Sequence, residues 1–163
     1  MEELTKFVFS KKRKMIRTIF KKKGGSSFLN SINIAKWHIY AASLVDCTFF
    51  CFSYLYKERN FSQTKEANKI FFEILNSEKA NGMFPDAFNS ASEEFNLRYE
   101  KINWLNYCDD DPFNYSSNAL YNWAPIADEL KKLDKKIVLN SMLLKWNNIQ
   151  NDFKKLTSKF NSK

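Results

Sequence analysis

The spacing of apolar residues along the chain predicts helices rather than strands. Apolar side chains recur three and four positions apart, which places them on one face of a helix. Four segments after the first third of the chain show this spacing: 63–80, 90–106, 117–123 and 126–160. Gly and Pro number three each, and Val is equally scarce, which favours a few long helices over many short strands joined by tight turns.

Local signals suggest where these helices begin and end. Asn81-Gly82 predicts the C-terminus of the helix over 63–80. Pro85-Asp86 is expected in the following connection, because Ser90 to Glu93 has the capping-box pattern of a helix start. The last helix is so long that we expect it to bend or protrude, with a bend at Asn140-Ser141.

Residues 39–56 are the most apolar part of the chain and contain a single charge, Asp46. Their length approaches that of a membrane span, but Asp46 at the centre costs about 2.5–3.5 kcal/mol of insertion free energy, which roughly cancels the gain from the apolar residues. We therefore favour a central core helix with a narrow polar stripe that includes Ser43, Asp46 and Ser53. Asp46 then needs a buried partner, and the candidates are Arg98 and a lysine at a helix end.

The first part of the chain differs from the rest in charge. Residues 1–23 hold nine Lys or Arg and two Glu, which gives +7 of the net +8 and leaves +1 for the other 140 residues. We expect a basic amphipathic helical arm over residues 1–23, a flexible joint over 24–31 that begins with Gly24-Gly25, and a helical domain over 32–163. The residues expected to contact phosphates are Lys11, Lys12, Arg13, Lys14, Arg17, Lys21, Lys22 and Lys23.

The stretch FSKKRKMIRTIFKK in this arm resembles the basic helix in the C-terminal subdomain of rRNA adenine dimethyltransferases. The positions that carry the resemblance are Leu4, Phe7, Phe9, Lys12, Arg13, Lys14, Ile16 and Arg17. In that family the subdomain helps to hold ribosomal RNA. The resemblance covers about 23 of 163 residues, and no glycine-rich cofactor loop follows a strand, so it implies RNA contact and not methylation. The same arm also suits an anionic membrane surface or a protein partner.

The three cysteines and the single histidine raise the question of a metal. Cys47, Cys51, Cys108 and His38 offer the ligand types of a zinc site, but their spacing matches no common zinc pattern. We interpret the cysteines as small core residues, and their odd number indicates a reducing, cytoplasmic compartment. The sequence therefore predicts no metal, no cofactor and no catalytic residue.

The most distinctive stretch of the body is WLNYCDDDPFNYSSNALYNW. Its three adjacent carboxylates lack the alternating ligands and glycine turn of a calcium loop, so we expect them to be solvated. Aromatic residues flank them, and exposed aromatics anchor partners or stack on bases. The resulting possible partner site comprises Trp104, Tyr107, Asp109, Asp110, Asp111, Tyr115 and Trp123.

These observations predict an all-α, bundle-like domain of about five or six helices with a basic N-terminal arm. The favoured function is non-enzymatic binding of RNA or another polyanion, within a ribonucleoprotein or other protein assembly. A membrane-associated protein that uses the arm and residues 39–56 is an alternative. A small enzyme or a protein-interaction module is another, and an enzyme requires Asp46, His38 or the acidic loop to converge in a pocket. The sequence leaves the oligomeric state open.

Overall fold

The computed structural model describes residues 25–123 and 128–159. Within these ranges the chain forms five α-helices and no strand, which confirms the all-α, bundle-like fold. The helices are α3 (Gly25–Arg59), α4 (Lys65–Ala80), α5 (Pro85–Tyr99), α6 (Asn114–Trp123) and α7 (Asp128–Lys159). The arm expected over residues 1–23 lies outside the described residues.

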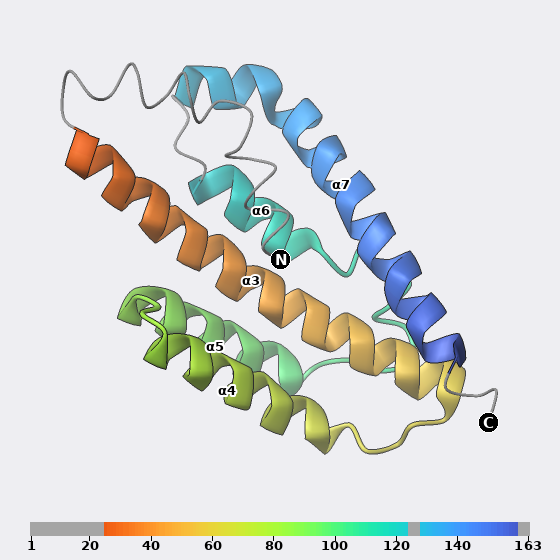
Figure 1. The fold of residues 1–163 in the computed structure, drawn as a ribbon. Helices are drawn as coiled ribbons and strands as arrows, with labels where there is room; N and C mark the ends of the chain where they lie inside the picture. The colour runs from red at the N-terminus through yellow and green to blue at the C-terminus, as the bar shows by residue number, and fades with distance from the viewer. Residues whose placement is uncertain (1–24, 124–127, 160–163) are drawn as a thin grey trace.

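α3 is the central helix and is covered on two sides (Figure 1). On one side lie α4 and α5, and the core there includes Val45, Phe49, Phe71 and Phe95. On the other side lie α6 and α7, and a second cluster contains Ile39, Phe50, Phe113, Leu120 and Trp146. Because α3 is buried on both sides, it is apolar around most of its circumference, as the stretch 39–56 suggested.

The burial of α3 bears on the membrane alternative. By length and composition α3 is apolar enough to cross a membrane from Leu29 to Arg59, with a mean hydropathy of 1.3. Its most apolar window is 61% buried inside the bundle, however, and a buried core helix of a soluble protein passes the same test. The apolar surface of α3 is therefore used for packing in this fold.

Residues 25–31 of the flexible joint expected over residues 24–31 are helical, because α3 already begins at Gly25. Ser31 donates its hydroxyl proton to the carbonyl of Ser27, four residues earlier, as in a regular helix. α7 is one continuous helix of 32 residues that Asn140-Ser141 does not interrupt, and Figure 1 shows this helix curving along its length. Asn and Ser are less than about 1 kcal/mol worse than Ala inside a helix, which is too little to interrupt one that packs on its neighbours.

α5 is shifted from its predicted range. It begins at Pro85, whose fixed φ suits the first helical position, so the expected capping box at Ser90 lies inside the helix. It ends at Tyr99 rather than near residue 106. The Asn103 side chain accepts a hydrogen bond from the N–H of Leu105, and this local bond favours a turn over a further helical turn. Leu105, inside the range 90–106 that was expected to be helical, lies after the helix end and is 52% exposed.

The turn between α4 and α5 agrees with the sequence. α4 ends at Ala80, and Asn81 is its C-cap. Gly82 follows with φ of +96°, a conformation that glycine adopts without steric cost. This tight connection makes α4 and α5 an antiparallel pair on one side of α3 (Figure 1).

Candidate functional site

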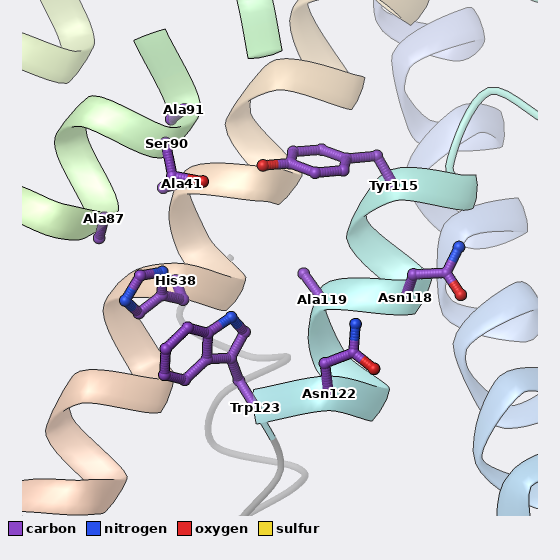
Figure 2. Close-up of a pocket in the computed structure, with 10 residues that line it drawn as sticks. All are labelled: His38, Ala41, Ala87, Ser90, Ala91, Tyr115, Asn118, Ala119, Asn122 and Trp123. Atoms are coloured by element: carbon purple, nitrogen blue, oxygen red, sulfur yellow. The ribbon is translucent and has the colours of Figure 1, made fainter. Parts of the chain in front are cut away.

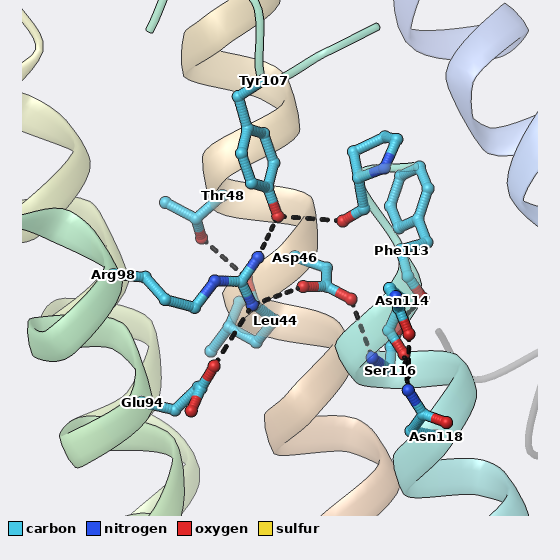
Figure 3. Close-up of polar contacts among 11 residues, drawn as sticks. Leu44, Asp46, Thr48, Glu94, Arg98, Tyr107, Phe113, Asn114, Ser116 and Asn118 are labelled. Atoms are coloured by element: carbon cyan, nitrogen blue, oxygen red, sulfur yellow. Dashed lines mark hydrogen bonds and ion pairs between the residues drawn. The ribbon is translucent and has the colours of Figure 1, made fainter. Parts of the chain in front are cut away.

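Asp46, near the middle of α3, is fully buried and fully hydrogen-bonded. Arg98 of α5 donates from Nη1 to Oδ1 of Asp46 at 2.8 Å, as the sequence predicted (Figure 3). The backbone N–H of Ser116 donates to the other carboxylate oxygen at 2.7 Å. Ser116 lies in the first turn of α6, where the backbone N–H groups have no partner within the helix. Asp46 thus caps α6 from another helix and places its negative charge at the positive end of that helix.

Aromatic rings surround the other side of the ion pair. Arg98 donates a second hydrogen bond to the hydroxyl of Tyr107, which in turn donates to the carbonyl of Pro112 at 3.0 Å. The Arg98 guanidinium also lies 5.1, 5.4 and 5.8 Å from the ring centres of Phe49, Tyr107 and Tyr115. These contacts connect α3, α5, α6 and the connection before α6.

The electrostatics of this network suit a structural role. Burial raises the pKa of the Asp46 carboxyl, while the Arg98 charge and the Ser116 N–H favour its ionised form. Burial likewise raises the pKa of Tyr107, and the nearby Asp46 charge adds to the effect. Since both oxygens of Asp46 already accept hydrogen bonds from the protein, neither is presented to a substrate. Arg98 and Tyr107 do border an open groove of 390 Å³ together with Lys101 and Asp110.

A second group of polar side chains lies where α3, α5 and α6 meet (Figure 2). It is a cavity of 230 Å³ whose lining includes His38, Ser90, Tyr115, Asn122 and Trp123. The imidazole of His38 and the indole of Trp123 are stacked, with ring centres 3.6 Å apart and planes at 4°. Trp123, at the end of α6, is 42% exposed, so the stack lies at the edge of the cavity next to solvent.

The titratable groups of this cavity favour their neutral forms at pH 7. Burial lowers the pKa of His38, and the Asp86 charge opposes this only in part. Burial raises the pKa of Tyr115, and the hydroxyl of Ser90 acts in the opposite direction. The cavity therefore offers hydrogen-bonding groups and ring faces without a formal charge. Asp46 and His38 do not meet in one pocket, because Asp46 is absent from the lining of this cavity.

The possible partner site of the sequence analysis is divided by the fold. Trp104, Tyr107 and Tyr115 pack against the core between α3, α4 and α5, and Trp123 borders the cavity. Asp109 pairs with Lys57 at 2.6 Å, which lowers the pKa of its carboxyl. The other two carboxylates of the loop, Asp110 and Asp111, are exposed. The stretch is therefore no single surface, although Tyr115 and Trp123 both line a cavity that the sequence did not reveal.

Metal-binding residues do not gather in the part of the chain that the structure describes. No group of three or more His, Cys, Asp or Glu side chains there could hold a metal ion. Cys47, Cys51 and Cys108 are unpaired and pack against the cluster between α3, α6 and α7. Burial raises the pKa of Cys51 to about 12, so its thiol stays protonated at pH 7.

The eight basic residues expected to contact phosphates lie outside the described residues. Comparison with protein-family models, with curated proteins and with solved structures finds no match.

Proposed function

We propose that this protein is a non-enzymatic, intracellular RNA-binding protein that grips the phosphate backbone through residues 1–23. One observation carries the proposal: residues 1–23 account for +7 of the net charge of +8. Lys and Arg that neutralise phosphates release condensed counterions, and this sequence-independent term dominates the binding of most basic proteins to nucleic acid. The helical body acts as the scaffold and offers contacts to a larger assembly.

The low net charge outside residues 1–23 supports the assignment of phosphate binding to these residues. The other 140 residues carry a net charge of only +1. Some of their exposed lysines have acidic neighbours: Lys57 pairs with Asp109 at 2.6 Å, and Lys155 lies 3.8 Å from Asp152. A polyanion therefore gains little long-range attraction from the body and much from residues 1–23.

The test compares two charge-matched variants of the full chain in binding to a short single-stranded RNA. The arm variant replaces five residues by Gln: Lys11, Lys12, Arg13, Lys14 and Arg17. The matched control replaces five exposed lysines of the body by Gln: Lys65, Lys69, Lys136, Lys155 and Lys159. Both variants have the same net charge, so a difference between them reports the place of the charge.

We expect wild-type affinity to fall steeply between about 50 and 200 mM salt. The arm variant should lose most of the affinity, and its slope of log affinity against log salt should flatten by about 3–4 units, since each phosphate contact on a single strand contributes about 0.7. The body variant should keep nearly the wild-type slope. Equal losses in the two variants, or no RNA binding by the wild type, would contradict the proposal.

A membrane-surface function is the second candidate: α3 is long and apolar enough between Leu29 and Arg59 to cross a membrane, although most of its apolar window is buried in the bundle. A basic amphipathic segment binds anionic lipid through the same charges that bind phosphates of RNA. Co-sedimentation with phosphatidylserine vesicles separates the two. Vesicle binding that is lost in the arm variant, together with absence of RNA binding by the wild type, would establish the lipid function instead.

A further inference from the structure

An open groove lies where α5 ends, and part of its lining is apolar. The groove has a volume of 390 Å³, and its lining includes Leu97, Arg98, Lys101, Ile102, Tyr107 and Asp110. The Leu97 side chain is 54% exposed, so the described helices leave much of it uncovered. Exposed apolar side chains that border a groove are typical of a surface on which another segment docks.

The chain around this groove is strongly acidic. Residues 93–111 hold six Asp or Glu and two Lys or Arg, which gives −4, whereas residues 24–163 as a whole carry +1. Asp110 lines the groove, and Asp111 follows it. Both carboxylates are exposed, and neither forms an ion pair with another described residue. We call the groove with these two carboxylates the acidic groove.

The two cations of the acidic groove do not make it a site for an anion. The Arg98 guanidinium lies 2.8 Å from Asp46 and 3.7 Å from Glu94, so its charge is compensated within the fold (Figure 3). Lys101 directly follows the exposed Glu100. An anionic ligand would therefore meet more negative than positive charge here, whereas a basic partner is attracted.

Residues 1–23 of the same chain have the complementary chemistry. They carry +7, and apolar residues recur among them at helical spacing: Leu4, Phe7, Val8, Met15, Ile19 and Phe20. A basic amphipathic segment docks by placing its apolar face in a groove while its charges meet the rim. Complementary charge also selects such a segment over neutral or acidic partners.

The length of this segment matches the distance to the acidic groove. Residues 1–24 end where α3 begins, at Gly25. Asp46, which Arg98 of the groove contacts, lies 21 residues further along α3, or about 32 Å at the helical rise. A helix of 23 residues spans about 35 Å. A segment that turns back at Gly24 therefore reaches the groove without any change in the bundle.

We propose that residues 1–23 dock on the acidic groove of their own chain when RNA is absent, and that RNA displaces them by binding the same Lys and Arg side chains. The docking stands on the charges and the groove alone, whereas the competition rests on the proposed RNA binding and adds a regulation to it. A docked arm binds weak or short polyanions poorly, because each must first displace the carboxylates.

The first experiment is zero-length cross-linking of the full chain with a water-soluble carbodiimide, which joins a lysine amine to a carboxylate that it touches. Mass spectrometry of the peptides locates the links. The pair of Lys57 and Asp109, 2.6 Å apart, is the internal positive control. We expect lysines of residues 1–23 to be linked to Asp110 and Asp111, and not to the exposed carboxylates of other surfaces: Glu66, Glu73 and Asp152. These links should decrease at about 1 M salt, where charges are screened within about 3 Å.

The same reaction tests the competition and the identity of the chain. A short single-stranded RNA without terminal phosphates should abolish the links between residues 1–23 and the acidic groove and leave the link between Lys57 and Asp109. A mixture of ¹⁴N- and ¹⁵N-labelled protein should give links within one isotope only. Links that join the two isotopes would overturn docking within one chain and assign the groove to a second copy.

The second experiment compares RNA binding by two variants with the same net charge. The groove variant carries Glu100→Gln, Asp110→Asn and Asp111→Asn, and the matched control carries Glu66→Gln, Glu73→Gln and Asp152→Asn. The effective concentration of a tethered segment is in the millimolar range, so even a site of about millimolar affinity is half filled. Release of the arm should therefore raise the RNA affinity of the groove variant at least about twofold above that of the control.

The outcomes separate the docking from the proposed function. RNA binding with links spread evenly over all exposed carboxylates, and equal affinities of the two variants, overturns the docking and leaves the proposed function standing. Links confined to the acidic groove without RNA binding by the wild type support the docking and overturn the proposed function. Links confined to the groove that bound RNA does not reduce overturn the competition.

Discussion

Arg98 on α5 reaches Asp46 on α3 at 2.8 Å, and Asp46 is completely buried. The carboxylate also accepts the backbone N–H of Ser116 in the first turn of α6. One aspartate thus connects the helix pair on one side of α3 with the helix on the other side (Figure 3). Because the same carboxylate holds α5 and α6, it fixes the two walls of the cavity that contains His38 and Trp123.

Replacing Arg98 by Met should destabilise the fold strongly. The substitution leaves the Asp46 charge buried with the Ser116 N–H as its remaining partner, and removal of one member of a buried pair typically costs about 3–5 kcal/mol. Urea unfolding followed by circular dichroism measures the loss. The double variant Asp46→Asn/Arg98→Met keeps an acceptor for Ser116 without a buried charge, so it should be more stable than Arg98→Met. If the double variant is no more stable than Arg98→Met, the two side chains are not coupled.

The aromatic stack in the core between α3, α4 and α5 gives a second prediction. The Phe95 ring lies 3.9 Å from that of Phe71 and 4.8 Å from that of Phe49, nearly parallel to both. Phe95→Ala should lower the free energy of unfolding by about 3–5 kcal/mol, because it leaves a cavity in a fully buried site. Leu97, two residues further along α5, is 54% exposed, and Leu97→Ala should change stability by less than about 0.5 kcal/mol. Similar losses of stability in both variants would contradict this packing of Phe95.

Two buried serines should behave in opposite ways. Ser53 donates to the carbonyl of Trp104 at 2.8 Å and accepts the N–H of Cys108 at 2.9 Å, so it ties the connection before α6 to α3. Ser53→Ala should cost about 1–3 kcal/mol, because it leaves backbone groups without partners. Among the described residues, Ser117 Oγ is buried without a hydrogen-bond partner, so Ser117→Ala should be neutral or stabilising within about 0.5 kcal/mol. Thermal and urea unfolding measure the stability of both variants. A larger loss of stability in Ser117→Ala than in Ser53→Ala would contradict the prediction.

The sequence revealed those features that depend on a single strong physical requirement. An isolated Asp in an apolar helix needs a counter-charge, and this requirement was enough to make Arg98 one of two candidate partners for Asp46 across 52 residues. Likewise, Asn81-Gly82 marks the end of α4 because only a few residue types adopt the required backbone conformation at low cost. In such cases one residue carries the constraint, so no knowledge of the fold is needed.

Features that depend on several helices at once were not predictable. The predicted start of α5 is wrong because Pro85 and Ser90 are both typical of a helix start. The packing of Ala87 in the core next to α3 favours the start at Pro85. The cavity was missed because its lining comes from three helices whose relative placement the sequence does not state. The one available signal was the pair of alanines Ala87 and Ala91, one helical turn apart, which indicates a close approach without naming the partner helix.

The environment of His38 predicts a pH dependence of stability. Burial lowers its pKa in the folded protein below the ordinary value of 6.5, so the unfolded chain takes up the proton first as the pH falls. The stabilising contribution is present above pH 6.5 and is lost as the pH falls through the lower folded pKa. We expect the melting temperature to fall as the pH is lowered from about 7.5 to about 5.

Two variants assign this dependence to His38, the only histidine of the chain. His38→Gln keeps a polar side chain that does not titrate, so its melting temperature should vary less over the same interval than that of the wild type. Asp86→Asn removes the charge that raises the pKa of His38, so the fall should become steeper. The comparison uses the change with pH within each variant, because Asp86 also lies in the first turn of α5 and affects stability at every pH. A melting temperature that falls equally in wild type and His38→Gln would show that the imidazole is not desolvated in the folded protein.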